Sequence, residues 1–284
     1  MSSAVYLRHM NKFEHPKPKV SIIIPCWFRE GQDGKYGKNE TYWFAQSCLR
    51  LLMKRTPYKI DGKLNYELIL VNNGSTLDMA NWLQEPNKGE MSPDSFWSNA
   101  DVLIKNKENL GFAPSCNQGF NLARGEYIVC MNDDIIVWPG WLEALIAVFE
   151  LNLEPQAGVV MPALMKQTRD VHEALAMNEI DLKQNYGKYS PGAEFGSCWM
   201  MPKKIMDELK AKDGYVFDEN FKLGMGEDRD LWDRVRLLGY ETYRCHETRV
   251  FHLGNMTIGK VKDRKDFTFA NREYLEKKRE ARKI

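Results

Sequence analysis

Three consecutive polar residues after an apolar run are the first side chains of this sequence that could do chemistry. Asn132, Asp133 and Asp134 directly follow the run YIVCM, which is typical of a buried strand. Two neighbouring carboxylates at the end of such a strand repel each other and are costly to desolvate. A divalent cation that prefers hard oxygen ligands, Mg²⁺ or Mn²⁺, would offset both costs. The alternative is a cap for the following helix, where Asp is also favoured.

A second acidic group follows two glycines. Gly224 and Gly226 lead into Glu227, Asp228 and Asp230 at the start of an expected helix. Carboxylates in this position are stabilised by the helix dipole, which is the simpler interpretation. The dipole does not explain why two glycines place the acids beside one another. Because a carboxylate held in a cleft is a natural general base, a catalytic and a purely structural role are both open.

Two further side chains are weaker candidates. His252 follows the apolar stretch RVF and precedes Leu-Gly, where a histidine is more often a core or capping residue than a ligand. Trp199 lies within FGSCWMM, and an aromatic residue among apolar neighbours is usually part of a core.

The elements that must position these residues alternate along the first half of the chain. Short apolar runs are separated by segments with helical spacing, among them a short helix expected around Asp78 to Gln84 and a third helix, APSCNQGFNLARG, closed by Gly125. The apolar runs are VSIIIPC, YELILVNN, DVLIKN, EYIVCMN and AGVVMPAL. This alternation predicts an α/β fold with a mostly parallel sheet covered by helices on both faces. Ligands of such sheets bind outside the carboxyl ends of the strands. The polar residues at those ends, Pro25 with Cys26, Asn72 and Asn132 to Asp134, should therefore lie together.

The regular alternation of apolar runs and helical segments ends after Ala163, which suggests how the chain is organised. A helix is expected from about Gly226 to Leu238, and residues 260–284 are highly charged and expected to be helical. We therefore predict one domain over 1–259, with a nucleotide-binding half at about 18–163 and a smaller, mixed acceptor-side and catalytic half at about 164–259. The charged segment 260–284 would be a C-terminal helical arm.

Bulk properties exclude some classes of protein. A net charge of only +1 argues against a nucleic-acid partner. The sequence has no apolar stretch long enough for a membrane span and no signal peptide at its start, so we expect a soluble, cytoplasmic protein. The cysteines are scattered and several lie in apolar runs, which predicts buried free thiols. They are Cys26, Cys48, Cys116, Cys130, Cys198 and Cys245.

Five segments, read in order from Val20 to Gly254, resemble the inverting family-two glycosyltransferases with the GT-A fold, particularly their rhamnosyltransferase-like branch. These segments are SIIIPCWFRE, ELILVNNGST, NLGFAPSCNQGFNLARGEYIVCMNDDI, FGSCWMM with FDENFKLGMGEDRDLWDRVRLLGY, and RVFHLGN. The resemblance implies transfer of a sugar from a UDP-, dTDP- or GDP-linked donor to a glycan, lipid-linked, protein or other acceptor.

The resemblance also implies a role for each motif residue. Asp134 would ligate Mn²⁺ or Mg²⁺ that bridges the donor diphosphate, and His252 would help to hold the metal or the diphosphate. Asp133 or Asn132 would approach the ribose. Asp228 would be the general base that takes a proton from the acceptor hydroxyl.

Further residues follow from the same resemblance. The nucleotide side would comprise Pro25, Cys26, Glu30, Asn72 and Asn117. Glu227 and Trp199 would line the acceptor side.

Two departures from the family pattern leave the base preference open. Many relatives carry Asp where this chain has Asn72, and an amide can donate a hydrogen bond as well as accept one. Ser115-Cys116-Asn117 stands where many relatives read Ala-Arg-Asn, so a donor-contacting arginine is missing. The acidic motif also starts with Asn132, which the rhamnosyltransferase-like branch tolerates.

Other functions remain as alternatives. A sugar nucleotidyltransferase would favour a Gly-rich phosphate loop after the first strand, of which PCWFREGQDGKYGK is a weak version. A non-catalytic nucleotide- or glycan-binding protein could also use a decayed transferase fold. The basic C-terminal arm either packs one face on the domain or makes a weak contact with an anionic membrane surface or acidic glycan.

Overall fold

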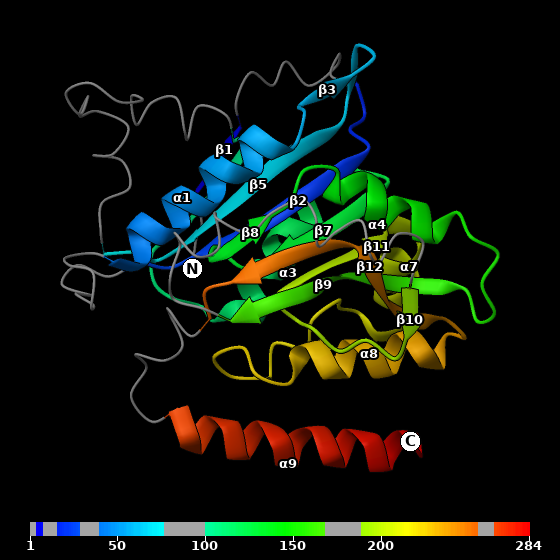
Figure 1. The fold of residues 1–284 in the computed structure, drawn as a ribbon. Helices are drawn as coiled ribbons and strands as arrows, with labels where there is room; N and C mark the ends of the chain where they lie inside the picture. Colours follow the sequence, from blue (N-terminus) through cyan, green and yellow to red (C-terminus); the bar gives the residue numbers. More distant parts are fainter. Residues whose placement is uncertain (1–3, 8–15, 29–39, 77–99, 168–188, 255–263) are drawn as a thin grey trace.

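The computed structural model describes residues 4–7, 16–28, 40–76, 100–167, 189–254 and 264–284. These residues form a large mixed sheet with helices on both faces (Figure 1). Its strands run in the order β1, β6, β5, β2, β7, β11, β9, β12 and β10, with β8 paired to β12. A separate small ribbon joins β3 (Lys59–Ile60) to β4 (Lys63–Leu64).

The first half of the sheet is parallel at its centre. Its strands are β2 (Val20–Cys26), β5 (Tyr66–Asn73), β6 (Val102–Asn106) and β7 (Tyr127–Met131), with β1 (Ala4–Leu7) antiparallel at the edge. Every residue of β2, β5 and β7 is buried, as expected for parallel strands covered on both faces. Because Cys26 pairs with Asn72 and Asn72 with Lys105, the carboxyl ends of these strands share one edge.

The second half of the sheet is mostly antiparallel. It contains β8 (Ile135–Val137), β9 (Ala157–Gln167), β10 (Tyr189–Pro191), β11 (Cys198–Pro202) and β12 (Glu241–His252). Strand β11 joins the two halves, because it pairs antiparallel with both β7 and β9.

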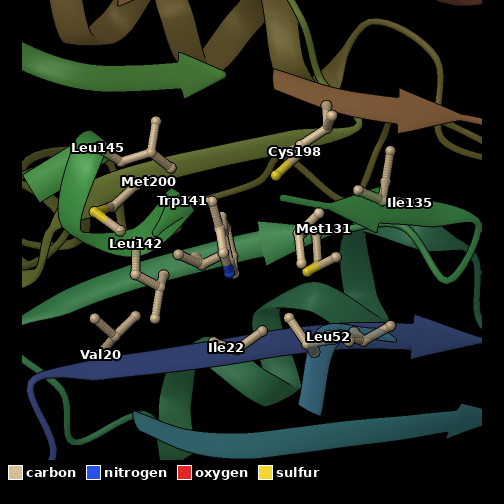
Figure 2. Close-up of a cluster of buried hydrophobic side chains, with 14 of the residues drawn as sticks. Val20, Ile22, Leu52, Met131, Ile135, Trp141, Leu142, Leu145, Cys198 and Met200 are labelled. Atoms are coloured by element: carbon tan, nitrogen blue, oxygen red, sulfur yellow. The ribbon is translucent and has the colours of Figure 1, made fainter. Parts of the chain in front are cut away.

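Helices cover the two faces of the sheet and enclose two cores. On one face lie α1 (Glu40–Arg55) and α4 (Trp141–Phe149), and on the other α3 (Phe112–Leu122), α7 (Lys203–Asp213) and α8 (Glu227–Leu237). Figure 2 shows the first core, with the fully buried Trp141 among Leu142, Met131 and Leu52. Packing on both faces fixes the edge of the sheet at which the carboxyl ends of β2, β5 and β6 lie.

Helix α9 (Arg264–Arg282) runs alongside α8 on the side away from the sheet (Figure 1). It is held there by ion pairs. Lys278 contacts Asp218 and lies 2.9 Å from Asp230, and Arg279 lies 2.7 Å from Asp233. The C-terminal arm is therefore helical, as predicted, and is docked on the domain by one face.

The predicted strands and helices of the described residues are confirmed, with differences at their ends. The third helix was expected to continue to Gly125 but ends at Leu122, because the next backbone N–H groups turn to the sheet: those of Arg124 and Gly125 donate to Ser21 Oγ. Strand β8 was not predicted as a separate element. The short helix expected at 78–84 lies outside the described residues.

The predicted burial of the cysteines is confirmed, since all six thiols are free and buried. Among the helices that the structure describes, none combines the length and apolar character needed to cross a bilayer.

Candidate active site

A cavity of about 840 Å³ opens at the carboxyl ends of the central strands, within the range of small-molecule sites. It is lined from one side by Pro25 and Cys26 of β2 and by residues 132–134 after β7, and from the other by Glu227 and Asp228 of α8. From β2 the chain adds β5 and β6 on one side of the sheet and then returns to add β7 on the other side of β2. The cavity therefore lies where the chain order reverses, which is the usual ligand site of such sheets.

Strand register brings Asp134 and His252 together. Strand β8 begins directly after Asp134, and its first residue, Ile135, pairs with His252 at the end of β12. The N–H of Leu253 donates to the Asp134 carbonyl at 3.1 Å. As a result, Asp134 Oδ1 lies 3.2 Å from His252 Nε2, with both residues more than 90% buried.

These two side chains fit a divalent metal. Within the described residues, Asp134 Oδ1 and His252 Nδ1 are buried without a hydrogen-bond partner, a costly state that a bound ion would relieve for the carboxylate. No group of three or more His, Cys, Asp or Glu side chains in the described part of the chain could hold an ion. Two protein ligands are nevertheless enough for Mg²⁺ or Mn²⁺ when substrate phosphates and water complete the coordination.

The neighbouring carboxyl adds to the charge at this point. Burial and the charge of Asp134 raise the pKa of Asp133 well above its usual range. Asn132 is fixed by its backbone, because its N–H donates to the carbonyl of Ser197 at 2.8 Å. This bond ties the end of β7 to the segment that precedes β11, so both halves of the sheet shape the cavity.

Glycine conformations place the second acidic group. Gly224 and Gly226 have φ of +87° and +105°, a region that favours glycine. A Cβ at Gly224 would lie 2.5 Å from Phe112 Cβ. Helix α8 begins immediately after Gly226 with Glu227 and Asp228 in its first turn. The two glycines therefore permit the tight turn before α8 that places the two acids.

Both carboxyl groups of this turn are easier to protonate than usual. Burial and the nearby Asp228 raise the pKa of Glu227 to about 8. Glu227 is 4% exposed, and its Oε2 has no hydrogen-bond partner among the described residues. Burial also raises the pKa of Asp228, although Oδ1 accepts a hydrogen bond from the Arg229 N–H at 2.8 Å.

Gly196 is a site residue that the sequence analysis did not single out. It lines the cavity with Ser197, and a Cβ at position 196 would lie 3.0 Å from Asp228 Cγ. Glycine at this position therefore permits the close approach of the Asp228 carboxyl group. Gly196 belongs to the motif FGSCWMM, in which the sequence analysis selected Trp199.

Three of the predicted site residues are absent from the described cavity lining. Trp199 is fully buried against Phe217 and Trp232, as expected of a core residue. Asn117 bridges α3 to the following half, since its side chain both donates to and accepts from the backbone of Phe217. Asn72 Oδ1 accepts the Ser75 N–H at 3.0 Å.

These three residues therefore act on the site through the elements that they hold. Glu30, also predicted near the nucleotide, lies outside the described residues. Asn73, which was not predicted individually, lines the cavity. Its amide donates to Asn109 Oδ1 at 2.8 Å and accepts the Leu110 N–H at 3.0 Å, so it fixes the loop at the end of β6.

Helix α9 supplies an unexpected wall of the cavity. The contributing side chains recur at helical spacing and therefore share one face of the helix. They are Thr268, Asn271, Arg272, Leu275 and Glu276. This spacing was readable in the sequence, but only the docking of α9 shows which face meets the cavity.

Comparisons with known proteins agree with this geometry. The sequence matches the profile of Glycosyl transferase family 2 over residues 38–210, more than half of the chain. It is 34% identical over 230 residues to an uncharacterized glycosyltransferase of Haemophilus influenzae, covering 72% of this chain and 65% of that protein. It is 29% identical over 143 residues to glycosyltransferase GlyG of Streptococcus pneumoniae, covering 50% of this chain and 38% of that protein. The chain thus spans less than two thirds of either relative.

Solved structures share the fold at low sequence identity. The S. aureus TarS fragment 1–349 superposes with a TM-score of 0.53 at 14% identity, covering 82% of this chain and 60% of that one. GalNAc-T7, solved with UDP, GalNAc and Mn²⁺, also gives 0.53 at 15% identity, covering 82% of this chain and 43% of that one. At these identities the likeness shows the fold alone.

Proposed function

Because this chain belongs to glycosyltransferase family 2 and has a GT-A-type fold, we propose that it transfers a sugar from a nucleotide-sugar donor to an acceptor hydroxyl, with a divalent metal and with inversion at the anomeric carbon. One observation carries the proposal. The Asp134–His252 pair and the Glu227–Asp228 turn, from opposite halves of the chain, line the same cavity. Donor activation and acceptor deprotonation could thus occur side by side.

Asp134 and His252 are the residues that would hold the metal. The bound cation would offset the charge that develops on the leaving nucleoside diphosphate. Pro25, Cys26 and the backbone of Asn132 border the same part of the cavity and would shape the nucleotide side. The GalNAc-T7 structure with UDP and Mn²⁺ supports a nucleotide donor and a metal as the first ligands to test.

Asp228 is the general base of this proposal. The acceptor oxygen bonds to the anomeric carbon while the bond from that carbon to the diphosphate oxygen breaks. The hydroxyl proton passes to Asp228, whose raised pKa makes it a stronger base than an exposed aspartate. Glu227, with a pKa of about 8, is largely protonated at neutral pH and can donate a hydrogen bond to the acceptor.

The donor sugar of this proposal is a hexose or a deoxyhexose. Neither curated relative nor either structure described above is named as a rhamnosyltransferase, so hexose and deoxyhexose donors are both tested. A nucleotidyltransferase or a decayed binding protein is disfavoured because carboxylates suited to metal binding and to proton transfer converge on one cavity. We do not include a membrane contact, because α9 uses three of its cations in ion pairs with the domain.

Calorimetric titration tests the proposal. UDP, dTDP, GDP and their common sugar conjugates are titrated with Mn²⁺ or with EDTA present. We expect one nucleotide family to bind with metal, and Asp134→Ala to weaken it about tenfold or more, equivalent to at least about 1.4 kcal/mol. Glu143→Ala, an exposed acid on α4, is the control and should bind like wild type. If no nucleotide binds with metal present, a binding role without transfer becomes the better interpretation.

A further inference from the structure

We propose that Arg272 and Arg229 form an anion-binding subsite on the acceptor side of the cavity, so that the acceptor carries a phosphate or carboxylate group near the hydroxyl that receives the sugar. This inference rests on the proposed function and names a substrate class for it. Both arginines line the cavity that contains Asp228. Arg229 follows the proposed base directly in α8, whereas Arg272 approaches from α9.

The position of α9 is fixed by buried charge. Asp230, with no exposed surface, lies 2.9 Å from Lys278 and 2.8 Å from Arg282, and also pairs with Arg234 within α8. Buried carboxylates of this kind require their partners, because an uncompensated charge in the interior is costly. The cavity-facing residues of α9 are therefore held in place by the domain itself.

Arg272 differs from three cations that follow it in this helix. Lys278, Arg279 and Arg282 all have carboxylate partners in the domain. Arg272 is exposed to the cavity and forms no ion pair within the described part of the chain. Its guanidinium group offers a planar set of N–H donors that matches phosphate or carboxylate oxygens.

Arg229 resembles Arg272 in this respect. Its backbone N–H donates to Asp228, but its exposed side chain forms no ion pair with another described residue. Two guanidinium groups that form no ion pair among the described residues thus line the cavity that contains the proposed base. They come from helices α8 and α9, and not from the strand ends that carry Asp134 and His252.

The acids of the cavity leave part of this positive charge uncompensated. Asp228 interacts electrostatically with Arg229, and the other acids are engaged elsewhere. Asp133 and Asp134 adjoin the proposed metal position, and Glu276 is 3.9 Å from Arg279 on its own helix. Glu227 is buried beside Asp228. The charge that remains uncompensated where α8 and α9 line the cavity is therefore positive, and an anionic acceptor would bind to it.

A titration observed by NMR can test the subsite without knowing the acceptor. The arginine Nε–Hε resonances of the full chain are followed during titration with inorganic phosphate or acetate, first without nucleotide and then with UDP and Mg²⁺ present at saturation. Sodium chloride at matched ionic strength controls for screening. We expect the signals of Arg272 and Arg229 to shift in a saturable manner. A stronger response to phosphate than to acetate indicates a phosphoryl acceptor, and the reverse indicates a carboxylate.

Variants decide whether the site is specific. Arg272→Gln should weaken phosphate binding about tenfold, the loss expected for a charge-assisted hydrogen bond, and Arg272→Lys should restore part of it. Lys277→Gln, exposed on the same helix and outside the described cavity lining, should bind like wild type. UDP binding should be unchanged in all three variants.

Three results would overturn the inference. Equal losses in Arg272→Gln and Lys277→Gln would show only non-specific attraction. Disappearance of the phosphate response on addition of UDP and Mg²⁺ would show that the arginines hold the donor diphosphate. A wild-type protein whose arginine signals do not respond to either anion has no such subsite. Failure to bind any nucleotide would instead contradict the proposed function, and the phosphate titration without nucleotide would still report on the arginines.

Discussion

At the scale of single residues, the absence of a side chain at position 196 matters as much as the carboxylate beside it. Gly196 does not have a left-handed φ, so alanine is compatible with its backbone. A Cβ there would nevertheless meet the Asp228 carboxyl group and displace it. We expect Gly196→Ala to lower kcat about 10- to 100-fold, as small misplacements of catalytic groups do.

The same substitution should leave the melting temperature nearly unchanged, because Gly196 faces a cavity with room for Asp228 to move. Steady-state kinetics and thermal unfolding of the same samples check both parts. A variant with wild-type kcat would show that the close approach has no importance for the reaction.

A second prediction concerns Glu227 and pH. Its folded-state pKa of about 8 exceeds the ordinary value of 4.5, so the folded protein binds more protons than the unfolded chain between these values. This group therefore makes stability fall as pH rises from about 4.5 to 8, by at most about 1.4 kcal/mol per pH unit. Glu227→Gln removes this loss.

We therefore expect Glu227→Gln to raise the melting temperature at pH 8 and to have little effect at pH 4.5. Thermal unfolding in the absence of metal and nucleotide measures the difference. An equal effect at both pH values would mean that the carboxyl ionises normally in the folded protein.

At the scale of elements, Asp230 connects α8 to α9. Asp230→Ala would leave Arg234, Lys278 and Arg282 without their shared carboxylate. We expect a loss of about 3–5 kcal/mol in the free energy of unfolding, together with reduced transferase activity as α9 loses its position. Urea denaturation provides the first measurement.

Asp207→Ala provides the comparison for Asp230→Ala. Asp207 pairs with Lys203 at 2.7 Å, but its side chain is 53% exposed, so its removal should cost less than about 1 kcal/mol. Similar losses in the two variants would show that burial of Asp230 does not determine its contribution.

Elements also show how far the sequence alone could lead. Runs of buried residues such as those of β2 and β5 are evident from composition, and the acidic residues after β7 and in the first turn of α8 follow from their spacing. Strand β8 has three residues, too few for a periodic pattern, although its pairing with β12 is what places His252 beside Asp134. The docking of α9 depends on partners far away in the chain, such as Asp218 and Asp230, which no local pattern connects.

Two predicted site residues with large or amide side chains, Trp199 and Asn117, do not line the described cavity. Trp199 and Asn117 lie in family motifs, and their motifs do reach the site. Their own side chains, however, are used for the core and for backbone hydrogen bonds. Spacing indicates which segment approaches a ligand, but it cannot show which of two neighbouring residues, Trp199 or Gly196, faces the cavity.

At the scale of the whole molecule, the charge that α9 leaves for other partners is balanced. Once Lys278, Arg279 and Arg282 are paired with the domain, four basic residues remain on α9 against four acidic ones. We therefore expect sedimentation with vesicles containing anionic lipid to be no greater than with neutral vesicles. Strong binding to anionic vesicles at physiological salt would show that the paired cations are available to lipid.

The hydrogen bonds that join the end of β7 to Ser197 and Asp134 to Leu253 have a consequence for how such a protein can change. The half of the chain that ends near Ala163 cannot be exchanged by itself between relatives, because His252, which contacts Asp134, and the backbone acceptor for Asn132 both lie in the other half. A chimera joined near Ala163 would contain Asp134 of this chain but the β12 of another protein, so the contact between Asp134 and His252 would be lost. Because α9 also lines the cavity, the smallest unit that can be recombined with its site intact runs from β2 through α9.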